Sequence, residues 1–61
     1  MDDRILLRPE EAALRLGLSR ATVYELISTG RIESISIGRS RRIPVKALEQ
    51  FVEAQRRAVA V

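Results

Sequence analysis

The side chains of this chain that could do chemistry are hydroxyls, carboxylates and, above all, guanidinium groups. Its 61 residues include ten arginines but neither cysteine nor histidine, which excludes disulfides, thiolate chemistry and the commonest catalytic base and metal ligand. The serines and glutamates do not suggest a convergent nucleophile and base. The sequence therefore predicts no catalytic residue, no metal site and no cofactor, and leaves charge and hydrogen bonding as the available chemistry.

One group of these side chains shares a predicted helical face. Val23, Leu26 and Ile27 recur at helical spacing and form an apolar stripe. The polar face and its N-cap carry the residues that we expect to contact a ligand: Ser19, Arg20, Ala21, Thr22, Tyr24, Glu25 and Ser28. Arginine can bind a guanine edge, whereas Glu25 can accept from a cytosine amino group, pair with Arg20 or reduce the positive charge of the helix. The alternative is a solvated face without a ligand.

A second group of cations lies between residues 34 and 48, where no acidic residue occurs. Alternation over Ser34–Ile37 predicts a half-buried strand, Gly38–Arg41 a turn, and Arg42–Ile43 a short second strand that ends before Pro44. The tip of this β-hairpin carries Arg39, Ser40, Arg41 and Arg42. Arginines suit a narrow DNA minor groove, although charge also protects the edge strands of a sheet from aggregation. Two further cations flank the hairpin and suit phosphate clamps, Arg31 and Lys46.

Two helices joined by a short turn position the polar face. Pro9–Leu16 predicts a helix of about two turns, Gly17 ends it, and Ser19 caps the helix that follows. Gly30 can close that second helix in the left-handed conformation. Ala13 is small enough to let the two helices approach closely. This spacing is typical of a helix-turn-helix motif.

The remaining segments complete a small core. Ile5–Leu7 predicts a brief strand, and Val45–Arg57 predicts a third helix that closes the core. We therefore expect residues 1–57 to form one α+β domain, a winged helix-turn-helix with three helices and a small β-hairpin wing. Ala58–Val61 is expected to fray or to act as a docking tail.

Charge and hydropathy narrow the class of partner. The net charge of +3 and the isoelectric point near 10.6 are, taken alone, only weak indications of a polyanionic partner. No apolar run approaches the length of a membrane span, and the N-terminus is too short and too acidic for a signal peptide. We expect a cytoplasmic protein that binds double-stranded DNA and no membrane.

Several stretches, taken in order, carry a resemblance to a known family: Leu7–Ala13, Leu16–Tyr24, Ile37–Arg39, Arg42–Pro44 and Ala47–Leu48. They resemble the excisionases, which are small winged helix-turn-helix proteins related to the DNA-binding domains of MerR-type regulators. The similarity extends from Leu6 to about Val52. Two positions depart from the family pattern, because threonine is common where Arg8 stands and a basic residue is frequent where Glu25 stands.

The resemblance implies a function. In that family the second helix lies in the major groove, and the wing reaches an adjacent minor groove. Several copies sit side by side on attachment-site DNA of a phage or mobile element, bend it, and assist an integrase, a tyrosine or serine recombinase, in excision. The alternatives are a small MerR-like transcriptional regulator on the same fold and a protein-interaction module.

Overall fold

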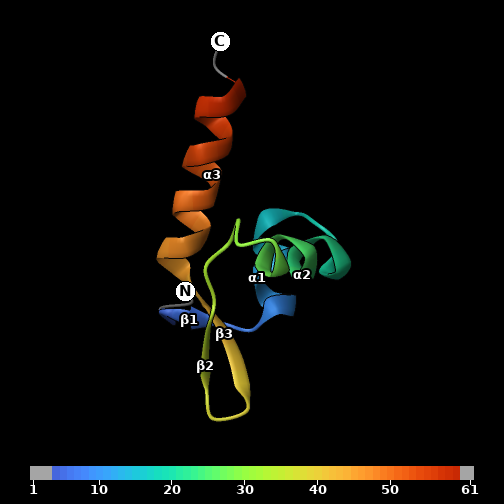
Figure 1. Cartoon of the computed structure of the whole chain (residues 1–61), viewed down its shortest axis with the longest axis vertical. Helices are drawn as coiled ribbons and strands as arrows, with labels where there is room; N and C mark the ends of the chain where they lie inside the picture. Colours follow the sequence, from blue (N-terminus) through green and yellow to red (C-terminus); the bar gives the residue numbers. More distant parts are fainter. Residues whose placement is uncertain (1–3, 60–61) are drawn as a thin grey trace.

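The computed structural model describes residues 4–59, which form three helices and three strands. In chain order these are β1 (Leu6–Leu7), α1 (Pro9–Leu16), α2 (Arg20–Ser28), β2 (Ile35–Ile37), β3 (Ser40–Pro44) and α3 (Val45–Val59). α1 and α2 lie beside each other, whereas the β2–β3 hairpin and the free end of α3 project in opposite directions (Figure 1). The predicted winged helix-turn-helix of class α+β is confirmed.

The start of α1 is fixed by Glu11 because the side chain of Arg8 does not cap the helix. The Glu11 carboxylate accepts a hydrogen bond from the backbone N–H of Arg8 at 2.9 Å, and it also pairs with Arg4. The bond from Arg8 is the largest influence on Glu11 and lowers the pKa of its carboxyl group. A proline at the first helical position completes this start, as predicted.

The turn between α1 and α2 has the predicted form. Gly17 has a φ of 70°, a left-handed conformation that residues with a side chain rarely adopt. The N–H of Leu18 donates to the carbonyl of Ala13, which closes α1. The hydroxyl of Ser19 then accepts from the N–H of Thr22 at 3.1 Å and caps α2. Local hydrogen bonds therefore specify the tight turn.

The end of α2 also follows the prediction. Gly30 has a φ of 77°, and its N–H donates to the carbonyl of Ile27. The N–H of Arg31 donates to the carbonyl of Leu26 at 2.9 Å, so the two bonds form a Schellman motif. This motif directs the chain from α2 towards the wing.

The three strands form one antiparallel sheet in the order β1-β3-β2. The hairpin turn is shorter than predicted, because Ser40 already pairs with Ile37 and only Gly38 and Arg39 remain in the loop. Gly38 has a φ of 62°, and a glycine with positive φ at the first loop position is typical of a type II′ turn. The loop thus presents Arg39 at the far end of the wing.

Pro44 lies inside β3, whereas the sequence predicts a strand that ends before it. It pairs with Leu6 of β1, and the next residue, Val45, donates its N–H to the carbonyl of Ile5 at 2.9 Å. The missing N–H of proline is tolerated because this neighbour supplies the next bond of the ladder. The first strand of the chain is consequently joined to the wing.

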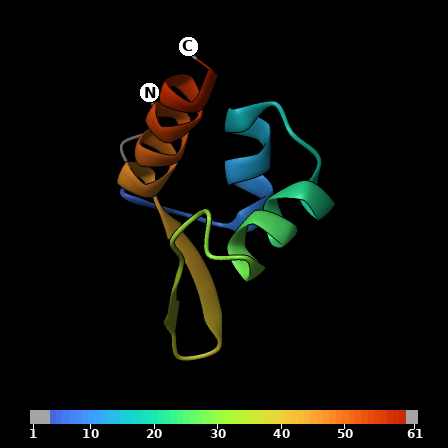
Figure 2. The same ribbon diagram turned by 45° about the horizontal axis from the view of Figure 1, so that its top comes forward.

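The prediction of a half-buried strand at Ser34–Ile37 is wrong for the paired residues of β2, which are all exposed. Ile35 is 37% exposed and Ile37 is 57% exposed. The reason is tertiary, since the hairpin that carries β2 extends away from the helices (Figure 2). Alternation correctly indicates a strand here, but it cannot show whether anything packs on it.

The core lies where α1, α2, β1, the base of the wing and the start of α3 meet. Its buried side chains are Leu7, Ala12, Ala13, Val23, Ile32, Ile43, Ala47 and Leu48. Val23 is fully buried, and Leu26 and Ile27 pack against the same cluster, so the predicted apolar stripe of α2 is confirmed. This packing fixes the orientation of the opposite, polar face.

α3 begins on the core and continues beyond it. Val52 is 43% exposed and Val59 is 78% exposed. The helix includes Ala58 and Val59 of the predicted tail, while the rest of that tail, Ala60 and Val61, lies outside the described residues. Among residues 4–59, no helix combines the length and apolarity required to cross a bilayer.

Candidate nucleic-acid interface

The outward face of α2 holds the predicted ligand contacts. All are exposed, and with the N-cap they comprise Ser19, Arg20, Ala21, Thr22, Tyr24, Glu25 and Ser28. The inward stripe packs against the core. A helix held on one side and open on the other is the form that enters a major groove.

Hydroxyl groups on α2 make local hydrogen bonds. The oxygens of Ser19 and Thr22 lie 2.8 Å apart, and the Ser28 hydroxyl donates to the carbonyl of Glu25 at 2.9 Å. The Ser28 oxygen donates and therefore keeps its lone pairs for another donor, whereas the Ser19 oxygen already accepts from the N–H of Thr22. These contacts orient the side chains before any ligand is bound.

Arg20 is held between two other side chains. Its guanidinium carbon lies 5.3 Å from the centroid of the Tyr24 ring, a cation–π distance. Its Nε lies 3.5 Å from Oε1 of Glu10, which belongs to α1. Tyr24, and to a smaller extent Glu10, raises the pKa of Arg20. From the sequence, Glu25 is one candidate ion-pair partner of Arg20. Within residues 4–59, the carboxylate that pairs with Arg20 is instead that of Glu10.

The arginines of the wing do not share one face. Residues directly opposite each other in an antiparallel pair project to the same side, and neighbours along a strand project to opposite sides. Arg41 lies opposite Ser36, and Arg42 lies opposite Ile35. Arg41 and Arg42 therefore point away from each other, while Arg39 occupies the loop.

Arg41 faces α2. Its Nη1 donates to the hydroxyl of Ser34 at 2.7 Å, and its side chain lines a cleft between α2 and the wing. Tyr24 and Ser28 line this cleft from α2, and Glu33 lines it from the connecting loop. A strand of anionic backbone that entered the cleft would meet Arg41 on one wall and α2 on the other.

Arg31 and Lys46, the predicted phosphate clamps, are not brought together. Arg31 donates to the side-chain oxygen of Gln55 and lies over the ring of Phe51 at 6.0 Å. Lys46 is nine residues before Gln55 on α3, about 14 Å along the helix axis. It lines a different hollow, together with Arg4 and Arg15. Arg31 thus links the end of α2 to α3.

Two residues that contact arginines of the candidate interface were not identified from the sequence. Glu10 pairs with Arg20, and Ser34 accepts a hydrogen bond from Arg41. Nothing periodic relates Glu10 to Arg20, because they lie on different helices and only the packing of those helices brings them together. For Ser34 a signal existed, since a hairpin turn at Gly38 and Arg39 places it on the same face as Arg41. Within residues 4–59, no three side chains of histidine, cysteine, aspartate or glutamate gather as metal ligands.

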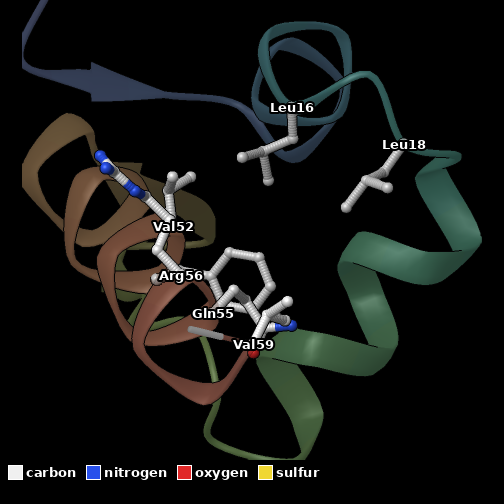
Figure 3. A pocket seen from close by; sticks show the side chains of 7 residues that line it. Leu16, Leu18, Val52, Gln55, Arg56 and Val59 are labelled. Carbon is white, nitrogen blue, oxygen red and sulfur yellow. The ribbon is translucent and has the colours of Figure 1, made fainter. Parts of the chain in front are cut away.

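An apolar groove lies apart from this interface, between α3 and the turn that follows α1. Figure 3 shows Leu16 and Leu18 on one side, facing Val52 and Val59 of α3 on the other. The remaining lining residues are Phe51, Gln55 and Arg56. None of the polar residues of the α2 face lines this groove.

Comparison with known proteins follows the same elements. The family described as "Helix-turn-helix domain" matches residues 6–56, which includes α1, α2 and the wing. An excisionase of Streptomyces ambofaciens is 42% identical over 50 residues, which are 82% of this chain and 81% of that protein. The chain belongs to the excisionase family of small helix-turn-helix proteins.

A second relative extends the comparison. A probable excisionase of Saccharopolyspora erythraea is 49% identical over 51 residues, which are 84% of this chain. The match spans only about half of that relative, 52% of its length. No solved structure matches the chain.

Proposed function

We propose that this member of the excisionase family binds double-stranded DNA with α2 in the major groove and the wing loop in an adjacent minor groove. The observation that carries the proposal is the cleft between α2 and the wing, in which Arg41 faces the polar side of the recognition helix. One phosphate backbone separates a major groove from the neighbouring minor groove. A protein that occupies both must therefore accommodate that backbone between its two contacting elements.

The roles of the side chains follow from their positions. Arg20 and Tyr24 on the open face of α2 contact base edges in the DNA major groove. The other exposed residues of this face lie against the walls of the same DNA groove: Ser19, Ala21, Thr22, Glu25 and Ser28. Arg41 binds the phosphates that pass through the cleft. Arg39, at the end of the wing, enters the minor groove, where narrow segments concentrate negative potential. We assign no catalytic step to any of these residues.

In this proposal the DNA is the attachment site of a mobile element, and the protein assists an integrase in excision inside the cytoplasm. The names of the two relatives support this role. Single recognition helices contact few base pairs, so several copies must bind side by side to mark one site, and they bend the DNA as they add. Two exposed apolar surfaces could join such neighbours, the groove at Leu18 and Val52 and the wing face at Ile35 and Ile37.

A gel shift and a footprint on the DNA that flanks the gene test the proposal, with and without the neighbouring integrase. We expect a stepwise series of shifted bands and a footprint over tandem sites. In an excision assay, the integrase with this protein should excise more DNA than the integrase alone. Binding that does not weaken as salt increases would refute a phosphate-dominated interface. A single saturating complex without a bend, or binding without an effect on excision, would refute the excisionase role.

Arg20→Ala tests the assignment of the recognition helix. A bidentate contact from arginine to guanine discriminates by about 1 to 3 kcal/mol, so this variant should lose preference at one base position. Base-by-base substitution in the footprinted site measures that preference. An equal loss of affinity on every sequence would instead make Arg20 a phosphate contact.

A further inference from the structure

Arg20, the proposed base contact, is held from two sides by side chains of two different helices. We propose that Glu10 of α1 is a specificity-determining positioning residue, which holds the Arg20 guanidinium on the Tyr24 ring and directs it to a base instead of a phosphate. This inference rests on the proposed function. The sequence did not indicate a role for Glu10 beside Arg20, and the ion pair between them brings Glu10 to the interface.

The geometry of the pair leaves one edge of the guanidinium for a ligand. Glu10 engages Arg20 through Nε, on the inner side of the guanidinium group. The outer edge, formed by Nη1 and Nη2, can then present two parallel donors to the O6 and N7 of guanine. Tyr24 lies one turn further along α2, and the guanidinium carbon of Arg20 lies over its ring, 5.3 Å from the centroid. A single fork orientation is therefore favoured before DNA arrives.

The position of Glu10 is set by the core and not by the side chain itself. It lies in the first turn of α1. Two and three residues later, the buried Ala12 and Ala13 pack that helix into the core that it shares with α2. A carboxylate in the first helical turn is also stabilised by the helix dipole, which accounts for its presence on α1 but not for its pairing with Arg20. Measurements of DNA discrimination separate these two roles, because stabilisation of α1 does not depend on the DNA sequence.

Charge gives the arrangement its selectivity. When Arg20 turns to a phosphate it exchanges one anionic partner for another and leaves Glu10 near a repelling charge. When Arg20 binds guanine through its outer edge, the acceptors are neutral and the bond to Glu10 is kept. The carboxylate therefore opposes binding to every DNA sequence, and this opposition is offset only where a guanine meets Arg20.

The test compares Glu10→Gln with Glu49→Gln, which removes the same charge from an exposed position on α3. The probes are a duplex selected by the wild-type protein from a random pool, and a random-sequence duplex of equal length. We expect Glu10→Gln to bind the random duplex about two- to five-fold more tightly, the range for an exposed ion pair, and to lower the ratio of selected to random affinity by a similar factor. Glu49→Gln should leave the ratio unchanged.

A second comparison places the effect on Arg20. In an Arg20→Ala background, Glu10→Gln should no longer change the ratio of affinities, whereas in an Arg57→Ala background it should change the ratio as before. The proposal is overturned if Glu10→Gln and Glu49→Gln give the same ratio, or if the effect survives without Arg20. Failure of the wild-type protein to select any duplex would instead refute the proposed function, so the two failures are distinguishable.

Discussion

Leu7 lies directly opposite Ile43 in the ladder between β1 and β3, and both side chains are fully buried. Ile43 follows Arg41 and Arg42 on β3, so the same strand joins the exposed wing to the core. The pair therefore anchors the wing in a fixed orientation relative to α2. A short N-terminal strand, which contributes no side chain to the interface, thus helps to position it.

Truncation of this anchor should destabilise the whole domain. Ile43→Ala removes a fully buried side chain and leaves a cavity, so we expect it to lower the free energy of unfolding by about 2 to 5 kcal/mol. Ile37→Ala, at an exposed position of the wing, serves as the control and should change it by less than about 0.5 kcal/mol. Urea unfolding of both variants checks the prediction. Equal effects would mean that the wing and the core are not coupled through β3.

The face of the wing that lines the cleft should contribute to DNA binding more than a cation at the free end of α3. Arg41→Ala is expected to weaken binding to all sequences and to reduce the slope of log affinity against log salt by about one unit, because Arg41 lines the cleft. Arg57→Ala, near the free end of α3, should leave that slope unchanged. Fluorescence anisotropy titrations at several salt concentrations measure the slopes. If both variants lower the slope equally, general charge and not the cleft governs affinity.

Acid should weaken the start of α1. The hydrogen bond from Arg8 lowers the pKa of Glu11 in the folded protein, so its contribution to stability is complete above the ordinary pKa of a glutamate. That contribution is lost as the pH falls below this value and through the lowered pKa of the folded state. Glu11→Gln should therefore be less stable than the wild type near neutral pH and should lose less stability in acid. Thermal unfolding across this pH range would contradict the assignment if the two proteins kept a constant difference.

Contacts between DNA-bound copies should depend on the apolar surfaces outside the interface. Val52→Ser, in the groove of Figure 3, is expected to weaken the binding of the second copy on tandem sites while the affinity for a single site stays the same. Sedimentation of the free wild-type protein should show mainly monomer. A tight dimer in solution, or unchanged cooperativity in the variant, would contradict neighbour contacts through this groove.

Some of the fold could be predicted because it is locally encoded. Gly17 and Ser19 fix the turn through their own backbone geometry and hydrogen bonds, and the spacing of Val23, Leu26 and Ile27 identifies the inner side of α2. The exposed side of α2 follows by elimination, and the predicted contacts there are all accessible. Elements whose character depends on neighbours were predicted less well, as the exposed side chains of Ile35 and Ile37 show.

The sequence by itself determined the helix-turn-helix, the presence of a basic hairpin and the absence of histidine and cysteine chemistry, since caps, glycines and composition act within a few residues. Only the tertiary structure decided which charged side chains lie near each other and which lie apart. The register of β2 and β3 separates Arg41 from Arg42, and the packing of α1 on α2 sets Glu10 beside Arg20. These relationships join residues that are distant in the chain, and their distances follow from how the elements pack.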